Sequence, residues 1–257
     1  MLADLVAGAL EDAAQRRQTI SLADVERAAL AQTSALDVMT ALAPADRVKI
    51  IAEVKRASPS RGPLADIPDP AALAVSYETG GASAISVLTE GRRFGGSLAD
   101  LEEVRSTVSV PVLRKDFIAE SYQVLEARAA GADLVLLIVA ALEQPHMQQL
   151  FDLIGELGMS ALVETHSAEE VERALDLGAS IVGVNARNLS TFGLDRDLFG
   201  ELADSIPSGV IRIAESAVKT SADVAHYRAA GADVVLVGEA LVTGGDPIAT
   251  LQEFRSV

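Results

Sequence analysis

Short runs of apolar residues alternate with longer segments of helical pattern along most of the chain. Several runs are apolar throughout, as expected for strands that helices cover, and each intervening segment is long enough for one helix. The runs predict eight strands, at residues 49–54, 84–88, 111–114, 133–138, 160–164, 181–185, 210–214 and 233–237. Eight strand–helix units in succession are the pattern of a single (β/α)8 TIM barrel of the α/β class.

A Gly-Ala pair precedes every second predicted strand. Each glycine stands where a helix would end, and a positive φ at that position lets the chain turn into the next strand. The pairs are Gly81-Ala82, Gly131-Ala132, Gly178-Ala179 and Gly231-Ala232. This repeat supports the barrel and carries no information about function.

Residues 1–46 lie outside the eight units and have a helical pattern of their own. Apolar residues recur at helical spacing from Leu2 onward, and Ser21 with Asp24 indicates the N-cap of a second helix. We therefore expect residues 1–46 to form an N-terminal helical extension packed on the barrel, and residues 47–257 to form the catalytic barrel domain. The extension would either lie over the barrel mouth or cover one face.

The composition narrows the class of protein. A chain of 257 residues fits one such barrel, and the absence of cysteine excludes disulfides and thiolate metal sites. His146, His166 and His226 do not have the spacing of metal ligands, so we expect no metal. The N-terminus lacks the pattern of an export signal, and the longest uncharged apolar stretch, 134–142, is too short to cross a bilayer. We expect a cytoplasmic protein that is not bound to a membrane.

The formal net charge of −16 argues against nucleic acid or an anionic membrane as a partner. An anionic small molecule is compatible with this charge, because a few positive groups in a cleft can outweigh a distant negative surface. Most of the 21 basic residues are arginines, and the lysines are Lys49, Lys55, Lys115 and Lys219. Each lysine therefore needs an explanation.

Polar residues stand at the C-terminal ends of six predicted strands, where this fold carries its chemistry. Alternation along the first strand places Glu53 and Lys55 on the same side, pointing into the barrel mouth. The other strands end in Lys115, Glu164, Asn185 with Arg187, Glu215, and Glu239. One such residue alone would be read as a solvated loop residue, but burying several charges together is costly unless they are paired or used. We therefore expect these residues to meet in one cavity.

Two features indicate a phosphate site at the same end of the barrel. The first is the small loop Ser58-Pro59-Ser60-Arg61-Gly62 after the first strand, which is a weak signal alone. The second is the pair of loops after the last two strands, where barrels often bind phosphate through backbone N–H groups. These loops contain Ser216-Ala217 and Gly238-Glu239. Glu239 can contribute its N–H only if its carboxylate points away from the phosphate.

Several segments together are similar to one family of barrel enzymes. They are IIAEVKRASPSRG (50–62), SVLTEGRRFGGSL (86–98), PVLRKDFI (111–118), ALVETH (161–166), GVNARNL (183–189), IAES (213–216) and LVGEALV (236–242). On these segments the chain resembles the indole-3-glycerol phosphate synthase family along essentially its whole length, including the helical N-terminal extension. The pattern Glu-x-Lys-x-x-Ser-Pro-Ser, followed by Leu-Arg-Lys-Asp-Phe, is not general among barrels.

The resemblance implies a reaction and a set of catalytic residues. The family closes the pyrrole ring of 1-(2-carboxyphenylamino)-1-deoxyribulose 5-phosphate, releasing CO2 and water without cofactor or metal, in tryptophan biosynthesis. By resemblance, Lys115 is the general acid at the substrate ketone and Glu164 is the second proton-transfer group. Lys55 would hold the anthranilate carboxylate, and Glu53 would pair with the lysines and orient them.

The remaining implied residues contact the substrate. Asn185 and Glu215, counted among the catalytic residues, would contact its hydroxyls and reacting end together with Arg187. Phe94 and Phe117 would pack on the anthranilate ring, although either could be an ordinary packing residue. The phosphate site would comprise Ser58, Ser216, Ala217, Gly238 and Glu239.

The chemistry calls for these residue types independently of the resemblance. Formation of a carbon–carbon bond at a ketone develops negative charge on the oxygen, which a nearby ammonium can stabilise and protonate. Loss of water needs a second acid or base, which a carboxyl group of raised pKa can supply.

Two positions depart from the family pattern. Ala217 stands where the family usually has the glycine of Glu-Ser-Gly, and alanine can serve there if its φ is allowed, because only the backbone N–H is needed. Gly95-Gly96 stands where a glutamine-glycine pair is common, which would loosen that loop. Neither departure removes a proton-transfer group.

Two other functions remain open from the sequence. One is another phosphate-binding barrel enzyme such as phosphoribosylanthranilate isomerase, which would not need Lys55 together with Lys115. The other is a non-catalytic protein that binds a phosphate ligand. For the enzyme we expect a small anionic phosphate as substrate and a monomer as the working form.

Overall fold

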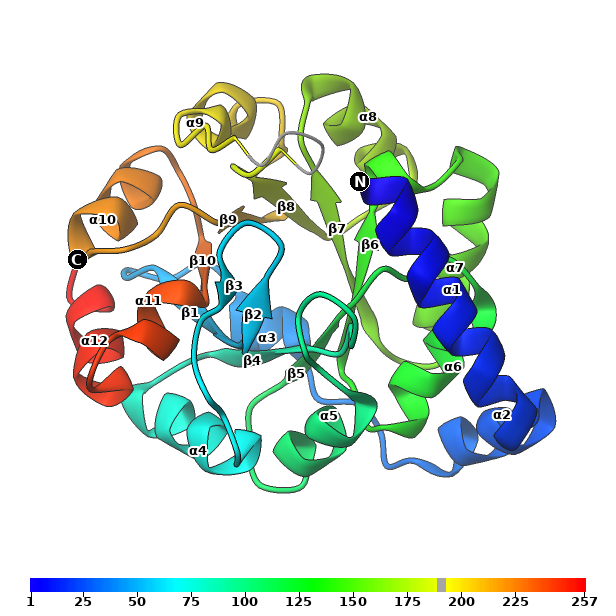
Figure 1. Ribbon diagram of the computed structural model, residues 1–257. Helices are drawn as coiled ribbons and strands as arrows, with labels where there is room; N and C mark the ends of the chain where they lie inside the picture. Colours follow the sequence, from blue (N-terminus) through cyan, green and yellow to red (C-terminus); the bar gives the residue numbers. More distant parts are fainter. Residues whose placement is uncertain (189–192) are drawn as a thin grey trace.

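Eight parallel strands close into a barrel in the computed structural model, which describes residues 1–188 and 193–257 (Figure 1). The strands are β1 (Lys49–Val54), β4 (Ala84–Leu88), β5 (Val112–Lys115), β6 (Leu134–Ile138), β7 (Ser160–Thr165), β8 (Ile181–Asn185), β9 (Ile211–Glu215) and β10 (Val234–Val237). Closure comes from β1, which pairs with both β4 and β10. The predicted TIM barrel is confirmed, and every predicted strand end agrees with the structure to within one residue. Leu189, the last residue of the segment GVNARNL, lies outside the described residues.

Helices alternate with the strands and form the outer layer of the barrel (Figure 1). Side-chain caps set where they begin: Asp69 accepts the N–H of Ala72, and Ser167 accepts that of Glu170. The outer helices are α4 (Pro70–Gly80), α5 (Leu98–Arg105), α6 (Ser121–Ala129), α7 (Gln144–Glu156), α8 (Ala168–Asp176), α9 (Leu198–Ala203), α10 (Ser221–Ala229) and α12 (Pro247–Phe254). The hairpin β2 (Ala57–Ser58) with β3 (Gly62–Pro63) follows β1, and η1 (Val139–Ala141) and α11 (Glu239–Thr243) follow β6 and β10. Within residues 1–188 and 193–257, no helix has both the length and the apolar character needed to cross a bilayer.

The chain turns from helix to strand at each of the predicted glycines. Gly81, Gly131, Gly178 and Gly231 have φ angles of 93°, 88°, 81° and 95°. L-residues with a Cβ are strained in this left-handed region, whereas glycine enters it freely. The predicted role of the Gly-Ala repeat at helix ends is therefore confirmed.

Most of the apolar core lies in two layers, one inside the barrel and one between the strands and the helices. A smaller cluster joins the first two helices of the chain to α6. Along β1, Ile51 belongs to the inner cluster, whereas Ile50, Ala52 and Val54 belong to the outer one. Glu53 is two residues beyond Ile51 and therefore faces the inside, near the C-terminal end of the strand. Alternation along a strand thus delivers polar side chains to the barrel mouth.

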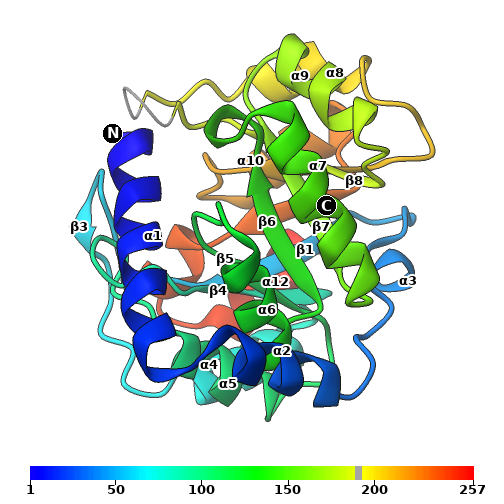
Figure 2. The same ribbon diagram turned by 90° about the vertical axis from the view of Figure 1, so that its right-hand side faces the viewer.

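The helices before β1 cover both ends of the barrel. They are α1 (Leu2–Thr19), α2 (Leu22–Ala31) and α3 (Val38–Leu42). The α1 helix lies along the end that carries the β2–β3 hairpin, and α3 lies at the opposite end (Figure 2). Leu5 and Ala9 of α1 join the inner apolar cluster, so α1 covers part of the mouth, while α2 packs along α6. The predicted cap is present, because the Ser21 hydroxyl accepts the N–H of Asp24.

Gly178→Ala is expected to lower the free energy of unfolding by about 1–2 kcal/mol, because alanine is strained in the left-handed region. A Cβ at Gly178 would meet no atom within 4 Å, so backbone strain alone is responsible. Gly155→Ala in α7 is the matched control: its Cβ also meets nothing, but its backbone is helical, so alanine is neutral or stabilising. Urea unfolding of both variants measures the difference, and equal stabilities would contradict the assignment of strain.

Candidate active site

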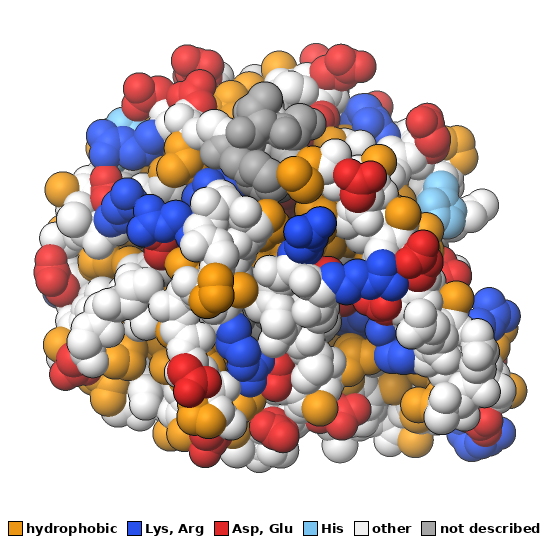
Figure 3. Space-filling view, viewed as in Figure 1, with side chains coloured by type: hydrophobic (Ala, Val, Ile, Leu, Met, Phe, Trp, Pro, Cys, Tyr) orange, Lys and Arg blue, Asp and Glu red, His pale blue; other side chains and the backbone are white. Residues whose placement is uncertain are grey.

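A cavity of about 570 Å³ opens at the C-terminal ends of the strands, and all of the site residues predicted from the sequence line it. They are Glu53, Lys55, Ser58, Phe94, Lys115, Phe117, Glu164, Asn185, Arg187, Glu215, Ser216, Ala217, Gly238 and Glu239. On this face, Lys and Arg side chains surround the centre, whereas most of the acidic side chains in view lie nearer the outline (Figure 3). The mouth therefore offers positive groups to an anionic ligand although the chain as a whole is acidic.

The ammonium group of Lys115 lies among three buried carboxylates. Its Nζ is 3.1 Å from Oε2 of Glu215, 3.5 Å from Oε2 of Glu164 and 4.0 Å from Oε2 of Glu53. Nζ of Lys55 lies 2.9 Å from the other oxygen of Glu53, Oε1. Glu53 thus joins the two lysines, and residues from four different strands meet around one point.

Burial and mutual repulsion separate the pKa values of the neighbouring carboxyl groups. Burial raises the pKa of Glu215 to about 8, with the charge of Glu164 adding to the rise and Lys115 opposing it. Burial also pushes the pKa of Glu164 up, but Lys115 and His166 outweigh it and lower the pKa. Burial alone would lower the pKa of Lys115, but the surrounding carboxylates raise it. Near neutral pH the pair of carboxyl groups therefore shares one proton, held mainly by Glu215, beside a charged Lys115.

Two glycines lie against this cluster and, because they have no side chain, provide the space that its carboxylates occupy. A Cβ at Gly183 of β8 would lie 2.2 Å from Oε1 of Glu215, and a Cβ at Gly238 would lie 2.6 Å from Oε1 of Glu53. Real Cβ atoms do not approach other atoms so closely, and a packed interior has no slack to absorb the overlap. A side chain at either position would displace a carboxylate from the cluster.

Two of the residues expected to bind phosphate, Ser216 and Ala217, form a strained turn after β9. Ser216 and Ala217 have φ angles of 70° and 58°, in the left-handed region that residues other than glycine rarely adopt. The Ser216 hydroxyl donates to Oδ1 of Asn185 at 2.8 Å, and the N–H of Arg187 donates to the same oxygen at 3.0 Å. Asn185 therefore ties the turn after β9 to the loop after β8.

The two aromatic residues form an apolar wall of the cavity. The ring centroids of Phe94 and Phe117 are 6.1 Å apart, with the ring planes inclined at 42°. Phe117 belongs to the apolar cluster inside the barrel and Phe94 packs against it. Both rings therefore serve the packing of the interior while offering a surface that suits a flat aromatic ligand.

The cavity also has lining residues that the sequence did not identify. They include Leu5 of α1, Arg61 of the β2–β3 turn and Lys219 after β9. Nη2 of Arg61 lies 3.1 Å from Oε1 of Glu239, so this carboxylate is paired with the hairpin. Arg61 belongs to the loop that predicted a phosphate site, but its ion pair with Glu239 could not be predicted from the sequence. Leu5 gave no signal beyond its helical spacing, because the spacing does not say which element the helix face meets.

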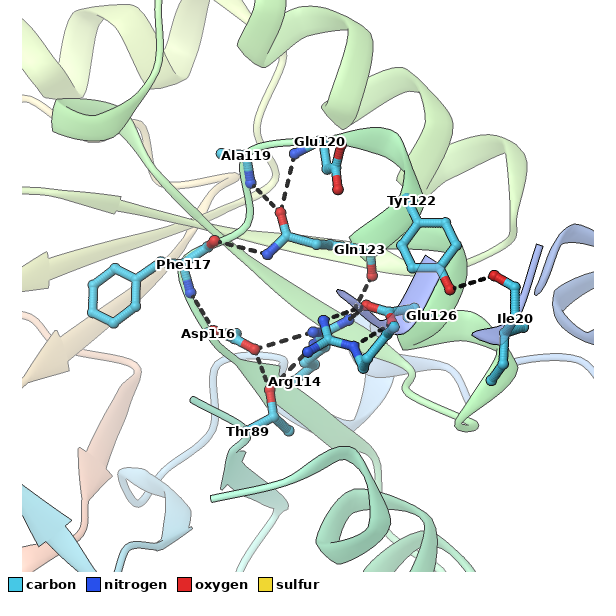
Figure 4. Close-up of polar contacts among 11 residues, drawn as sticks. Ile20, Thr89, Arg114, Asp116, Phe117, Ala119, Glu120, Tyr122, Gln123 and Glu126 are labelled. Carbon is cyan, nitrogen blue, oxygen red and sulfur yellow. Dashed lines mark hydrogen bonds and ion pairs between the residues drawn. The ribbon is translucent and has the colours of Figure 1, made fainter. Parts of the chain in front are cut away.

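Behind the ammonium cluster, a buried polar network fixes the turn after β5 (Figure 4). Arg114 is fully buried, and its guanidinium donates to Oγ1 of Thr89 at 3.2 Å, to the backbone oxygen of Gln123 at 2.6 Å and to Oδ2 of Asp116 at 3.0 Å. Oδ1 of Asp116 in turn accepts the N–H of Phe117 at 2.8 Å. Side chains thus hold the backbone on both sides of the lysine that enters the cavity.

The same network reaches the N-terminal helix. Glu126 of α6 lies 3.5 Å from Nη1 of Arg114 and accepts two hydrogen bonds from Arg16 of α1, at 2.5 and 2.8 Å. The network thus contains two guanidinium groups and two carboxylates, whose charges balance. They belong to Arg16, Arg114, Asp116 and Glu126. Buried pairs add little net stability, but the loss of one member leaves an uncompensated charge.

Comparison with known proteins identifies one family. The family model described as indole-3-glycerol phosphate synthase matches residues 2–254. A protein of that name from Leifsonia xyli subsp. xyli is 73% identical over 257 residues, which cover 100% of this chain and 98% of the relative. Another of that name from Mycobacteroides abscessus is 60% identical over 247 residues, which cover 96% of this chain and 90% of the relative. A solved 3-hexulose-6-phosphate synthase has a TM-score of 0.65 at 20% identity, covering 81% of this chain and 99% of its own, which shows the fold alone.

Arg114→Met is expected to lower the free energy of unfolding by about 3–5 kcal/mol, because it leaves Asp116 and Glu126 buried without the cation between them. Arg27→Met is the matched control, since Arg27 pairs with Asp24 on the exposed surface, where a pair contributes about 0–1 kcal/mol. Urea unfolding compares the two variants. A loss at Arg114 no larger than that at Arg27 would show that the network does not hold the turn.

Proposed function

Because the chain belongs to the indole-3-glycerol phosphate synthase family, we propose that its cavity binds 1-(2-carboxyphenylamino)-1-deoxyribulose 5-phosphate and closes the pyrrole ring on it. The protein is a decarboxylating lyase of tryptophan biosynthesis. The observation that carries the placement of the chemistry is the contact of Lys115 with three buried carboxylates in this cavity. The match over residues 2–254 favours this function over phosphoribosylanthranilate isomerase and over a non-catalytic phosphate-binding protein.

Lys115 acts as the general acid of the first step. Negative charge develops on the ketone oxygen as the ring carbon attacks, and an ammonium in a dry cavity stabilises that charge far better than water does. The raised pKa of Lys115 keeps its proton in place until the substrate arrives. The lysine then transfers this proton to the oxygen.

Glu164 acts as the second proton-transfer group, in the loss of water. It is ionised in the free protein and lies 3.5 Å from Lys115, so the two groups can exchange a proton. Glu215 contacts the reacting end of the substrate. Its proton, bound with a pKa of about 8, keeps a third negative charge out of the cluster, in which Glu53 and Glu164 are already ionised.

The remaining lining residues bind and orient the substrate. Lys55 holds the anthranilate carboxylate, and Glu53 orients both lysines through its two oxygens. Phe94 and Phe117 pack on the anthranilate ring. The sugar hydroxyls are contacted by Asn185 and Arg187, and the phosphate by Ser58, Ser216, Ala217, Gly238 and Glu239.

The assignment of the substrate-binding and catalytic residues also bears on the domains, the oligomeric state and the location of the protein. We assign residues 47–257 to the catalytic barrel domain and residues 1–46 to a helical extension packed on it, with α1 over part of the mouth. The working form is a monomer, because one chain supplies every residue assigned above. The protein acts in the cytoplasm on its small anionic phosphate substrate, and its net charge of −16 disfavours nucleic acid or an anionic membrane as a partner.

Lys115→Ala is expected to lower kcat by roughly 10²–10⁴-fold while substrate affinity stays close to that of the wild type, because other residues bind the phosphate and the anthranilate. Lys49→Ala is the control, since the Lys49 ammonium contacts the backbone oxygen of Thr40 in α3, at the far end of the barrel. The chain has no tryptophan, so the fluorescence of the indole product is measured directly on the purified protein. Normal turnover in Lys115→Ala would remove this residue from its role, and no indole signal from the wild type would refute the function.

Ala217→Gly is expected to raise the free energy of unfolding by up to about 1 kcal/mol, because glycine relieves the left-handed strain but adds entropy to the unfolded chain. KM for the substrate is expected to stay unchanged, since both residues offer the same backbone N–H to the phosphate. Ala14→Gly, at an exposed helical position of α1, is the control and should lower stability by about 1 kcal/mol. A loss of stability at both positions would show that the φ of 58° is not strained.

A further inference from the structure

Glu164 has a second polar neighbour on the side away from Lys115. Its Oε2 lies 3.5 Å from Nζ of Lys115, whereas its Oε1 lies 3.5 Å from Nε2 of His166. The other ring nitrogen of His166, Nδ1, lies 3.2 Å from Oε2 of Glu170 in α8. A line of contacts therefore runs from the lysine ammonium through Glu164 and His166 to Glu170.

Exposure to solvent rises along this line. The side chain of Glu164 is 2% exposed, that of His166 13% and that of Glu170 19%. Oε1 of Glu164 and Nε2 of His166 are both buried, and within the described residues neither has a hydrogen-bond partner, so their 3.5 Å contact is an ion pair that must shorten before a proton can pass. His166 does not line the substrate cavity, so the line leaves the site beside the cavity, between the C-terminal end of β7 and the start of α8.

The proposed reaction needs such a path because it takes up one proton in each turnover. The carboxylate of the substrate leaves as neutral CO2, and the electron pair of the broken carbon–carbon bond stays in the ring. The balance is one substrate with an ionised carboxylate plus one proton, giving indole-3-glycerol phosphate, CO2 and water. While the substrate fills the mouth, solvent is excluded from that side of Lys115 and Glu164.

We propose that His166 and Glu170 form a proton relay that supplies Glu164, and through it Lys115, from solvent. This relay rests on the function proposed above. In one transfer a proton passes from Nε2 of the imidazolium to Oε1 of ionised Glu164, which leaves a neutral imidazole with its remaining proton on Nδ1 towards Glu170. Nε2 regains the proton from solvent when the imidazole turns away from Glu164, because Nδ1 already carries a proton, and no electrons are transferred. His166 acts through Glu164 and is therefore a positioning residue.

The surroundings of His166 favour its charged form. Three carboxyl groups face the ring: Glu164 from β7, Glu170 from α8 and Glu215 from β9. Burial alone would lower the pKa of His166, but the hydrogen bond to Glu170 and the charges of these groups outweigh burial and raise the pKa. The folded protein therefore keeps the proton above the ordinary pKa of histidine and loses it only as pH rises through the raised value.

Glu170 also has a structural role at the start of α8, and the experiment must distinguish this role from its part in the relay. Its Oε2 accepts the backbone N–H of His166 at 2.7 Å, and its own N–H is capped by Oγ of Ser167 at 3.2 Å, at the start of α8. Glutamine at position 170 keeps an oxygen that can accept the N–H of His166 but has no charge. Glu170→Gln therefore preserves the cap while it removes the anion that holds the imidazolium.

The test measures kcat and KM of the full chain against pH, with 1-(2-carboxyphenylamino)-1-deoxyribulose 5-phosphate as substrate. Glu170→Gln is expected to lower the pKa of His166, so the alkaline fall in kcat moves to lower pH while KM is unchanged. His166→Phe is expected to lower kcat by roughly 10²-fold at unchanged KM. His166→Ala leaves room for free imidazole, which is expected to restore part of its rate when added to the buffer. His226→Phe is the control, because His226 pairs with Asp197 away from the cavity.

The possible outcomes distinguish a failure of the relay from a failure of the proposed function. Wild-type pH profiles in Glu170→Gln and His166→Phe, with unfolding temperatures unchanged, would overturn the relay alone. A change in KM without one in kcat would also overturn it. NMR titration of His166 does not depend on turnover: an imidazole pKa that is not raised, or that does not fall in Glu170→Gln, would count against the relay as well. A wild-type chain that forms no indole product overturns the proposed function, and the relay with it.

Discussion

The balance of charge around Lys115 holds the candidate active site together. An ammonium or a carboxylate buried alone would cost several kcal/mol, so each member of the cluster is tolerable only because the others are present. The barrel makes this possible by ending β1, β5, β7 and β9 at one level, so that side chains distant in the sequence arrive at one point. One proton with a pKa of about 8, at Glu215, relieves the remaining excess of negative charge.

The surroundings of the cluster follow from the need to keep these charges in place. Gly183 and Gly238 provide the room in which the carboxylates lie. Arg114 sits on the outer side of β5, next to the lysine, and fixes the following turn from behind. Through Glu126 and Arg16 the same network fastens α1, which covers part of the mouth. Catalytic geometry and the attachment of the N-terminal helix therefore share one set of buried charges.

Apolar periodicity predicted the barrel and its strands almost to the residue, because strands covered by helices are read directly from their composition. Alternation placed Glu53 correctly, and the sequence raised the question of φ at Ala217, for which the structure shows a left-handed value. The partners of Arg114 could not be predicted, since they depend on how α6 and α1 pack. His166 was considered only as a metal ligand, because the chain does not show that α8 brings a second carboxylate to its ring.

An NMR titration of the glutamate carboxyl carbons in the free protein measures the protonation of the cluster around Lys115 directly, with the signal of Glu215 assigned by its loss in Glu215→Gln. The Glu215 carboxyl is expected to titrate near pH 8, far above the ordinary range of glutamate. In Lys115→Met the transition is expected to move to higher pH, because the cation that favours the ionised form is gone. A wild-type Glu215 that titrates with the surface glutamates, unaffected by the loss of Lys115, would show that the cluster does not hold this proton.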